Sequence, residues 1–391
     1  MAMNRLAVTA RKIITPDTVI LDGVVLVEGS KILEVGSRQK VRFTETEFPI
    51  VDGPHHFLAP GFIDVHVHGA LGRDVMEGTS DALDVISQAM VRHGTTAYFA
   101  TTVTASSLKT LQAVEALGSQ VGQPRRGARM VGIHLEGPFI NSEKPGIHPV
   151  EHIHPPSVPI FDELLVHSGD HIKIITVAPE VEGGLELVQH ARSKGVVVSI
   201  GHSNATLEET REAIKLGATN VTHVFNAMRA FSHRDPGILG AVLTNSDVWV
   251  ELIADGVHVS PVAINLLIKC KQSNRILLIT DGISATGMPD GQYRFGDCRV
   301  MLSGGVCRSP DGKLAGSTLT QDQALRNLLY WSGLPLEEIV CMVTKNPAEA
   351  TGLADRKGSL GPGQDADMVL LKMDLTVQTT IVQGEVSYST G

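Results

Sequence analysis

The segment Gly61-Phe62-Ile63-Asp64-Val65-His66-Val67-His68 is an apolar, strand-like run that ends in two histidines two positions apart. Side chains alternate between the two faces of an extended strand, so His66 and His68 point to the same side. Two imidazoles at one strand end can hold one metal ion. With 16 histidines in 391 residues, chance supplies roughly half an His-x-His pair, so the pair needs support from the rest of the chain.

Seven more short apolar runs follow this one, and helical patterns separate several of them. The runs are 95–103, 130–135, 172–177, 196–200, 220–224, 248–253 and 276–280, and the helical patterns are 81–93, 107–118, 184–194, 207–216 and 261–272. Buried strands that alternate with helices favour an α/β fold, a (β/α)8 TIM-type barrel. An open doubly wound sheet is the alternative, which the lack of a GxGxxG after the first strand disfavours.

The two ends of the chain have a different pattern. Residues 6–10, 18–21, 24–27 and 31–35 are strand-like runs, and strand patterns return at 367–371 and 377–382 after helical segments at 319–331, 336–343 and 347–351. We expect residues 1–58 and 356–391 to form one small β-sandwich domain built from both termini. Residues 59–355 would then form the barrel, with catalysis at one of its rims.

The composition limits the partners of this chain. It is 42% hydrophobic and 19% charged, which is ordinary for a globular protein. A net charge of -9 argues against nucleic acid and anionic membranes as partners, and no apolar run approaches the length of a membrane span. The N-terminus lacks a signal-peptide core, and the four cysteines lack CxxC spacing. We therefore expect reduced thiols and a cytoplasmic location.

Almost every predicted strand end carries a His, Glu or Asp. Beyond the first pair, these residues are His134, Glu136, His202, His223, Asp255, His258 and Asp281. A single strand-terminal His is more often a satisfied polar residue, and a single Asp is commonly a helix cap. Six such ends on one rim instead predict a metal site, and a ligand set without Cys suits Zn²⁺ or Fe²⁺ acting on water. His134 is either a partner of the ligands or a packed barrel histidine.

Six segments of this chain resemble the amidohydrolase superfamily and, within it, the deacetylases of N-acetylglucosamine 6-phosphate. The segments are PGFIDVHVHG (60–69), HLEGPF (134–139), GHSNA (201–205), THVFNAM (222–228), ADGVHV (254–259) and TDG (280–282). The first is shared across the superfamily, whereas HLEGPF and HVFNAM are far more specific to the deacetylases. The resemblance covers most of the chain.

The resemblance implies a set of metal ligands. Glu136, His202 and His223 would hold the principal metal, and members that keep the His-x-His pair bind a second one. We therefore expect a divalent metal cofactor, one or two ions per subunit and two in this chain, with zinc favoured over iron. Glu136 would bridge the ions, and Asp281 would also touch the metal held by His66 and His68.

The reaction implied is hydrolysis of N-acetyl-D-glucosamine 6-phosphate to D-glucosamine 6-phosphate and acetate, a step of amino-sugar catabolism. Asp281 would be the general base that later protonates the leaving nitrogen, and His148 would polarise the carbonyl. The other substrate contacts implied are Ile147, Asn226, Ala227, Arg234, Asp255, His258, Leu314, Ala315 and Gly316. Arg234 and His258 would bind phosphate in the neighbouring subunit's site, which implies a homodimer.

Two other functions stay open. Motifs at the metal do not separate sugar epimers, so a deacetylase of N-acetylgalactosamine 6-phosphate fits the same residues. A barrel without catalytic activity could serve as a binding protein, but such a barrel would have lost ligands or the acid of the eighth strand, and here those positions are filled.

Overall fold

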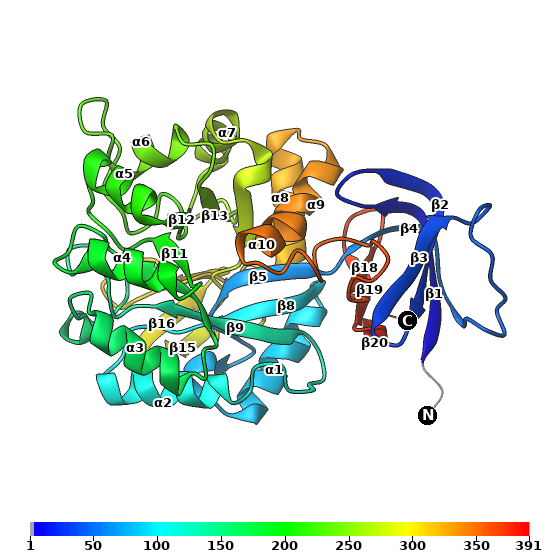
Figure 1. The fold of residues 1–391 in the computed structure, drawn as a ribbon, viewed down its shortest axis with the longest axis horizontal. Coiled ribbons are helices and arrows are strands. Elements are labelled where there is room, and N and C mark those ends of the chain that lie inside the picture. Colours follow the sequence, from blue (N-terminus) through cyan, green and yellow to red (C-terminus); the bar gives the residue numbers. More distant parts are fainter. Residues whose placement is uncertain (1–3, 391) are drawn as a thin grey trace.

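The eight predicted barrel strands form one parallel sheet in the computed structural model, which describes residues 4–390 (Figure 1). They are β5 (Phe62–Val67), β8 (Thr95–Thr101), β9 (Arg129–Glu136), β10 (Ile172–Val177), β11 (Val197–Ile200), β12 (Ala218–Val221), β13 (Trp249–Ile253) and β14 (Ile276–Ile279). The ring closes where Val67 pairs with Gly282 and the amide of Asp281 donates to the carbonyl oxygen of His66. The barrel is therefore confirmed over the open sheet.

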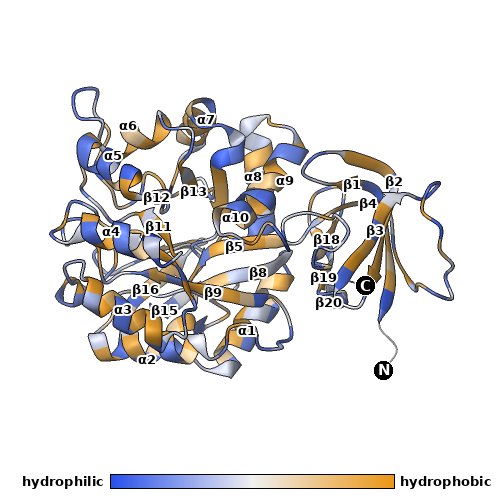
Figure 2. Cartoon of the chain, in the orientation of Figure 1, coloured by the Kyte–Doolittle hydropathy of each residue, from blue (hydrophilic) through white to orange (hydrophobic). Residues whose placement is uncertain are grey.

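Ten α-helices accompany these strands in the described part of the chain. They are α1 (Ser80–Val91), α2 (Ser107–Gly118), α3 (Val158–His167), α4 (Gly184–Ser193), α5 (Leu207–Leu216), α6 (Gly237–Leu243), α7 (Pro261–Cys270), α8 (Gln321–Ser332), α9 (Leu336–Val343) and α10 (Lys345–Ala350). Figure 2 shows apolar residues along the barrel strands and a mixture of apolar and polar residues on the outer helices. None of these helices has the length and apolar character that crossing a bilayer requires.

Two of the helices were not predicted. The segment before and within α3 is rich in prolines, which hides a helix in the sequence, but Pro159 stands in the first turn of α3, where a missing N–H breaks no hydrogen bond. The helix α6 has only seven residues and includes Gly237 and Gly240, so its helical period is too short to recognise in the sequence.

Both termini build a second sheet, as predicted. Its strand order is β20-β19-β18-β4-β1-β2-β3, formed by β1 (Arg5–Ile14), β2 (Val19–Glu28), β3 (Lys31–Ser37), β4 (Ile50–Pro60), β18 (Met368–Leu371), β19 (Val377–Val382) and β20 (Glu385–Ser389). Ile32 near one edge and Ile381 near the other share one apolar core, so the sheet curls around it in the manner of a sandwich. The predicted runs 18–21 and 24–27 are one strand, because Gly23 continues the pairing with β1.

Two connections place this sheet and a hairpin relative to the barrel rim. β4 ends at Pro60 and β5 begins at Phe62, so the small sheet leads directly into the first barrel strand. After β14, a three-stranded sheet that we did not predict is formed by β15 (Gly291–Phe295), β16 (Cys298–Ser303) and β17 (Val306–Arg308). Phe295 at the end of β15 packs edge-on against His68, with ring centroids 4.6 Å apart, so this hairpin covers the rim.

Candidate metal centre and active site

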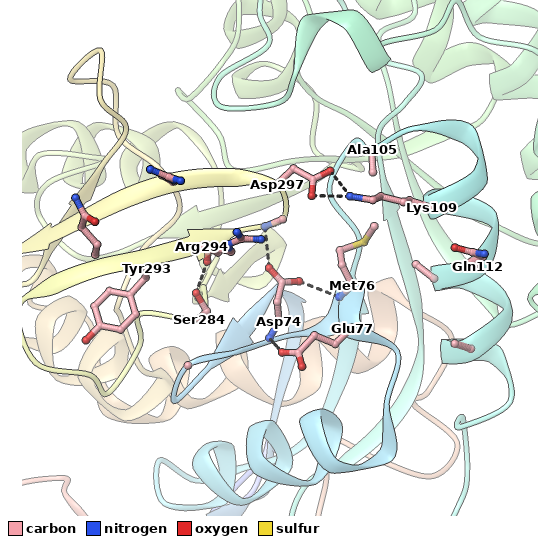
Figure 3. A pocket seen from close by; sticks show the side chains of 16 residues that line it. Asp74, Met76, Glu77, Ala105, Lys109, Gln112, Ser284, Tyr293, Arg294 and Asp297 are labelled. Atoms are coloured by element: carbon pink, nitrogen blue, oxygen red, sulfur yellow. Dashed lines mark hydrogen bonds and ion pairs between the residues drawn. The ribbon is translucent and has the colours of Figure 1, made fainter.

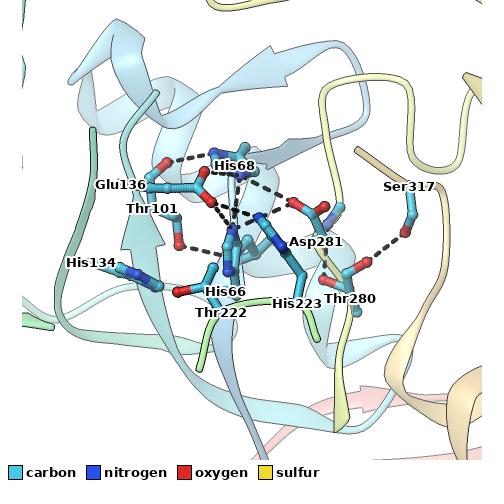
Figure 4. A network of polar contacts seen from close by, with 12 residues as sticks. His66, His68, Thr101, His134, Glu136, Thr222, His223, Thr280, Asp281 and Ser317 are labelled. Atoms are coloured by element: carbon cyan, nitrogen blue, oxygen red, sulfur yellow. Dashed lines mark hydrogen bonds and ion pairs between the residues drawn. The ribbon is translucent and has the colours of Figure 1, made fainter. Parts of the chain in front are cut away.

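The carboxylate of Glu136 lies among four histidines, of which Figure 4 labels His66, His68 and His223. Its Oε1 is 3.1 Å from His223 Nε2 and 3.3 Å from His202 Nε2. The same oxygen is 3.4 Å from His66 Nε2, and Oε2 is 3.4 Å from His68 Nε2. Glu136 therefore stands between the pair on β5 and the pair that follows β11 and β12, as the bridging ligand was expected to.

Asp281 lies on the side of the first pair. Its Oδ1 is 3.1 Å from His68 Nε2 and 3.5 Å from His66 Nε2. These three side chains form one group whose ligand atoms lie close enough together to hold one ion. The predicted residues for the second metal are thus brought together by the closure of the barrel between β5 and β14.

The spacing of these atoms fits a metal better than it fits hydrogen bonds. The Nε2 atoms of His202 and His223 are 3.0 Å apart, and those of His66 and His68 are 3.1 Å apart. Ligand bonds of about 2.0–2.1 Å in a tetrahedron put neighbouring ligand atoms about 3.3 Å apart. The observed distances of 3.0 to 3.5 Å lie around that value.

The other nitrogen of three of these rings donates to an oxygen of the protein. The acceptors are the Glu251 carboxylate for His66 (3.0 Å), the Thr101 carbonyl for His68 (2.9 Å) and the Lys144 carbonyl for His202 (2.9 Å). A ring nitrogen beside such an oxygen carries the hydrogen, so Nε2 is left with its lone pair. In His223, Nδ1 is buried and has no hydrogen-bond partner within residues 4–390. Several lone pairs therefore meet at one place, which is stable only around a cation.

The charges of the carboxylates favour the same conclusion. Burial alone would raise the pKa of Glu136, but the surrounding imidazoles hold it well below its usual range. Burial likewise opposes ionisation of Asp281, whereas His68 and His66 lower its pKa to about 2. Burial would lower the pKa of His66, but Glu136 and Glu251 raise it well above the usual value. The centre is thus an anionic environment that attracts positive charge at the imidazole nitrogens.

His148 is near this centre but offers it a hydrogen rather than a lone pair. The backbone N–H of Thr104 donates to His148 Nδ1 at 3.2 Å, so the ring hydrogen sits on Nε2. Burial lowers the pKa of His148 to about 4, with His202 adding to the shift, so the ring is neutral. Its Nε2 is 3.4 Å from Glu136 Oε2. Although spacing alone would admit His148 to a ligand group with Glu136 and His202, its tautomer makes it a donor.

Strained backbone aims three of the predicted residues at the centre. His202, His223 and Asp281 have φ angles of 47°, 28° and 49°, in the left-handed region that residues with a side chain rarely adopt. Each of them stands two residues after the last residue of a barrel strand, β11, β12 and β14 in turn. Such strain persists where the surrounding structure enforces it, and it gathers at functional sites. Gly137, with a φ of 75°, is required after Glu136 because a Cβ there would overlap the hydroxyl of Thr104.

A cavity of about 140 Å³ opens onto this centre. Its walls include most of the residues predicted to contact substrate, namely Ile147, His148, Asn226, Ala227, His258, Leu314 and Gly316, together with His68, Glu136, His202, His223 and Asp281. Three predicted contacts do not line it. Ala315 is fully buried, Asp255 lies behind His258, and Arg234 is on an exposed loop.

The ring of His258 lines the cavity of its own chain, and its expected reach into a neighbouring subunit stays a prediction. Asp255 holds the ring in this position, because its Oδ2 accepts from His258 Nδ1 at 2.6 Å and its Oδ1 accepts from the amides of Val257 and His258 at 2.8 Å. Asp255 therefore acts on the cavity through His258.

Sequence reasoning missed two residues of the centre. Glu251 lies in the middle of β13 and is fully buried beside His66. A signal for it was present, because it is the one charged residue in an otherwise apolar predicted strand. Phe295 lines the cavity against His68. No pattern marked it, since its hairpin was not predicted.

His134 was left open as a partner of the ligands or a packed histidine, and its hydrogen bonds fit packing. Its Nδ1 is 3.0 Å from the carbonyl oxygen of Val65, and its Nε2 is 2.8 Å from the hydroxyl of Thr176. Both ring nitrogens are thus occupied by the barrel interior. Burial lowers the pKa of His134 to about 4, so it is a neutral residue of the core.

A larger cavity of about 790 Å³ lies beside the hairpin, between β15, β16, α2 and the segment around Asp74 (Figure 3). Lys109 and Asp297 form an ion pair across it at 2.7 Å. Asp74 accepts from the amide of Gly296 at 2.9 Å. None of the predicted site residues lines this cavity, so the metal centre and its smaller cavity remain the candidate active site.

The chain is similar to known proteins both in sequence and in structure. The model described as Amidohydrolase family matches residues 57–387. The chain is 36% identical to N-acetylglucosamine-6-phosphate deacetylase of Bacillus subtilis (strain 168), over 96% of this chain and 95% of that protein. It is 39% identical to N-acetylgalactosamine-6-phosphate deacetylase of Escherichia coli O157:H7, over 84% of this chain and 87% of that protein. The structure of N-acetyl-D-glucosamine-6-phosphate deacetylase from Mycobacterium smegmatis matches with a TM-score of 0.91 at 33% identity, over 97% and 99% of the two chains.

Proposed function

This chain belongs to the amidohydrolase family, and on that premise we propose that it hydrolyses N-acetyl-D-glucosamine 6-phosphate to D-glucosamine 6-phosphate and acetate. The relatives named above act on this substrate or its epimer. The observation that carries the proposal is the convergence of Glu136, Asp281 and four histidines on one cavity. Such a group of ligands serves amide hydrolysis, because the reaction needs activated water and a sink for negative charge.

The residues that would hold the metals are those of the two groups. Glu136, His202 and His223 would hold one ion, and His66, His68 and Asp281 the other, with Glu136 shared. A divalent metal bound there lowers the pKa of a coordinated water to about 7 and polarises the carbonyl. We propose zinc, because nitrogen and oxygen ligands in tetrahedral spacing suit it, and iron as the alternative.

Asp281 moves the proton in this proposal. It is ionised at neutral pH and sits at the cavity wall, so it can accept a proton from the attacking water. The same carboxyl then returns the proton to the nitrogen of the sugar, which leaves as an amine. Its contact with His68 fixes the direction of the carboxylate.

His148 holds the carbonyl oxygen of the acetamide. Its Nε2–H faces the cavity, and Thr104 keeps the hydrogen on that nitrogen by donating to Nδ1. A donor held in place before the reaction stabilises the negative charge that develops on the oxygen. Asn226, Ala227 and Leu314 on the cavity wall would contact the sugar.

The phosphate would be bound by His258 of the same chain and by Arg234 of a second copy. Arg234 is exposed and does not line the cavity of its own chain. Exposed apolar side chains lie on α7, α8 and the loop of His258, namely Val257, Val262, Leu266 and Tyr330. We propose that a homodimer buries these side chains and that the exposed loop of Arg234 completes the neighbouring cavity.

We place the enzyme in the cytoplasm. The four cysteines Cys270, Cys298, Cys307 and Cys341 are all free thiols. Burial raises the pKa of the Cys307 thiol to about 11, so it is unreactive. Free thiols of this kind fit a reducing compartment.

A second candidate substrate is N-acetylgalactosamine 6-phosphate, which the 39% identity to a deacetylase of that sugar favours. Acetate release by metal-quantified protein from the two phosphorylated sugars, with unphosphorylated N-acetylglucosamine as a third, tests both readings. We expect kcat/KM to be highest for N-acetylglucosamine 6-phosphate. If kcat/KM is higher for the galactose epimer, N-acetylgalactosamine 6-phosphate becomes the proposed substrate. Absence of acetate from all three sugars would refute the proposed function.

A further inference from the structure

Glu251 is a buried carboxylate whose hydrogen bonds serve the metal centre. It lies on β13 among apolar neighbours, with its side chain fully buried. Its Oε2 is 3.0 Å from His66 Nδ1 and accepts from the backbone N–H of His223 at 3.3 Å. Its Oε1 has no hydrogen-bond partner among residues 4–390. Burying a carboxylate is costly, and this one stabilises no other part of the barrel through its side chain.

The four histidines differ in what holds them. His68 and His202 donate to backbone carbonyls, of Thr101 and Lys144. Those acceptors are present whatever side chain the residue carries. His66 donates to a side chain, so the orientation of its ring depends on one replaceable residue. The hydrogen on Nδ1 leaves the lone pair of Nε2 facing His68 Nε2, 3.1 Å away.

We propose that Glu251 is the positioning residue of the second metal site: its carboxylate holds His66 as an Nδ1–H tautomer and thereby decides whether the chain binds two metal ions or one. The inference rests on the proposed metal-dependent function. A carboxylate beside a ligand imidazole raises the basicity of the ring and fixes its direction, and loss of such a partner typically weakens metal binding 10- to 100-fold. At the site formed by Glu136, His202 and His223, the Glu251 side chain contacts no ring and accepts only from the backbone N–H of His223 at 3.3 Å, so that site should keep its ion.

The test is metal binding by the full chain, measured without substrate. The protein is stripped with a chelator, and zinc is titrated back against a competing indicator, with bound metal counted by mass spectrometry. We expect two ions per chain in wild type. Glu251→Met, which removes the acceptor at similar volume, should lower the affinity of the second site about 100-fold and leave that of the first within about threefold. Glu251→Gln keeps an acceptor oxygen and should lose about 10-fold at the second site.

Thr176→Val is the matched control. It removes the hydroxyl that contacts Nε2 of His134, a fully buried histidine in the same barrel interior that is not a ligand. We expect two ions per chain in this variant. In a His66→Ala/His68→Ala background, Glu251→Met should lower metal binding no further, because the ring it positions is absent.

Several outcomes would overturn the proposal. Two ions bound with wild-type affinity in Glu251→Met would do so, as would equal weakening of both sites. If Glu251→Met does not fold, the proposal is tested on Glu251→Gln alone. An unchanged metal affinity of the second site in Glu251→Gln would then contradict the proposal. A wild-type chain that binds one ion also overturns it, yet leaves the proposed function intact, since acetate release tests that function separately.

Discussion

The two histidine pairs of the metal centre are built in different ways. His66 and His68 are two residues apart on β5, and one extended strand aims both rings at the same side. His202 and His223 come from the ends of β11 and β12, and each needs a left-handed backbone to turn its ring inward. The first pair is a local property of the sequence, whereas the second exists only because two parallel strands end at one rim.

The two pairs also differ in their distance from the carboxylate of Glu136. Oε1 of Glu136 contacts the second pair at 3.1 and 3.3 Å and the nearest ring of the first pair at 3.4 Å. These distances support the proposal that the second pair forms the core of the principal site and that the first pair adds a second site, which shares Glu136. Removing each pair in turn should separate these roles.

The largest effect is expected from His202→Ala/His223→Ala. With both rings gone, Glu136 is the only predicted ligand left at the principal site, so we expect that metal to be lost and acetate release to fall to background. Metal content and turnover measure this together, and circular dichroism of the stripped protein controls for folding. Substantial turnover in this variant would contradict the assignment of the principal site.

Asp281→Asn should come next. The amide is close in size but cannot take a proton from water, so we expect kcat to fall about 10²- to 10⁴-fold. The metal at the Glu136, His202 and His223 site should remain, which metal analysis checks in the same preparation. Near-normal turnover would show that Asp281 is not the general base.

His66→Ala/His68→Ala should have a smaller effect than loss of the other pair. We expect bound metal to fall from two ions to one per chain, and kcat to fall about 10- to 100-fold, because the principal site and Asp281 remain. The comparison is made at equal protein concentration and saturating zinc. Equal metal content in this variant and in wild type would refute the second site.

Arg234→Ala should change substrate binding most of all. Hydrogen bonds to charged groups contribute about 1.5–3 kcal/mol, so we expect KM for the phosphorylated sugar to rise about 10- to 100-fold with kcat little changed. The unphosphorylated sugar serves as the control, because its KM should not respond.

Mixing subunits sharpens this last prediction. If Arg234 serves the neighbouring cavity, a heterodimer of Arg234→Ala and Asp281→Asn chains contains one intact site. At substrate concentrations well below KM, a random mixture should then recover about a quarter of wild-type kcat/KM after subunit exchange. No recovery would place Arg234 outside the neighbouring site.

Much of the fold was predictable because it depends on local pattern. The eight barrel strands are short apolar runs, and their periodicity and spacing survive in the sequence without knowledge of contacts. The hairpin of β15 to β17 was missed because its exposed positions, such as Arg294 and Arg299, interrupt the apolar pattern. Phe295 was missed with it, although it packs directly on His68.

The sequence by itself determined which residue types follow the strands, because short apolar runs mark the strands and the polar residues after them are read directly. Only the tertiary structure decided which of them meet. It put Asp281 beside His68 through closure of the barrel, kept His258 in its own chain's cavity through Asp255, and set Glu251 behind His66. These contacts either join residues on different strands or fix the direction of a side chain within a loop. No one-dimensional period encodes them, since they follow from packing in three dimensions.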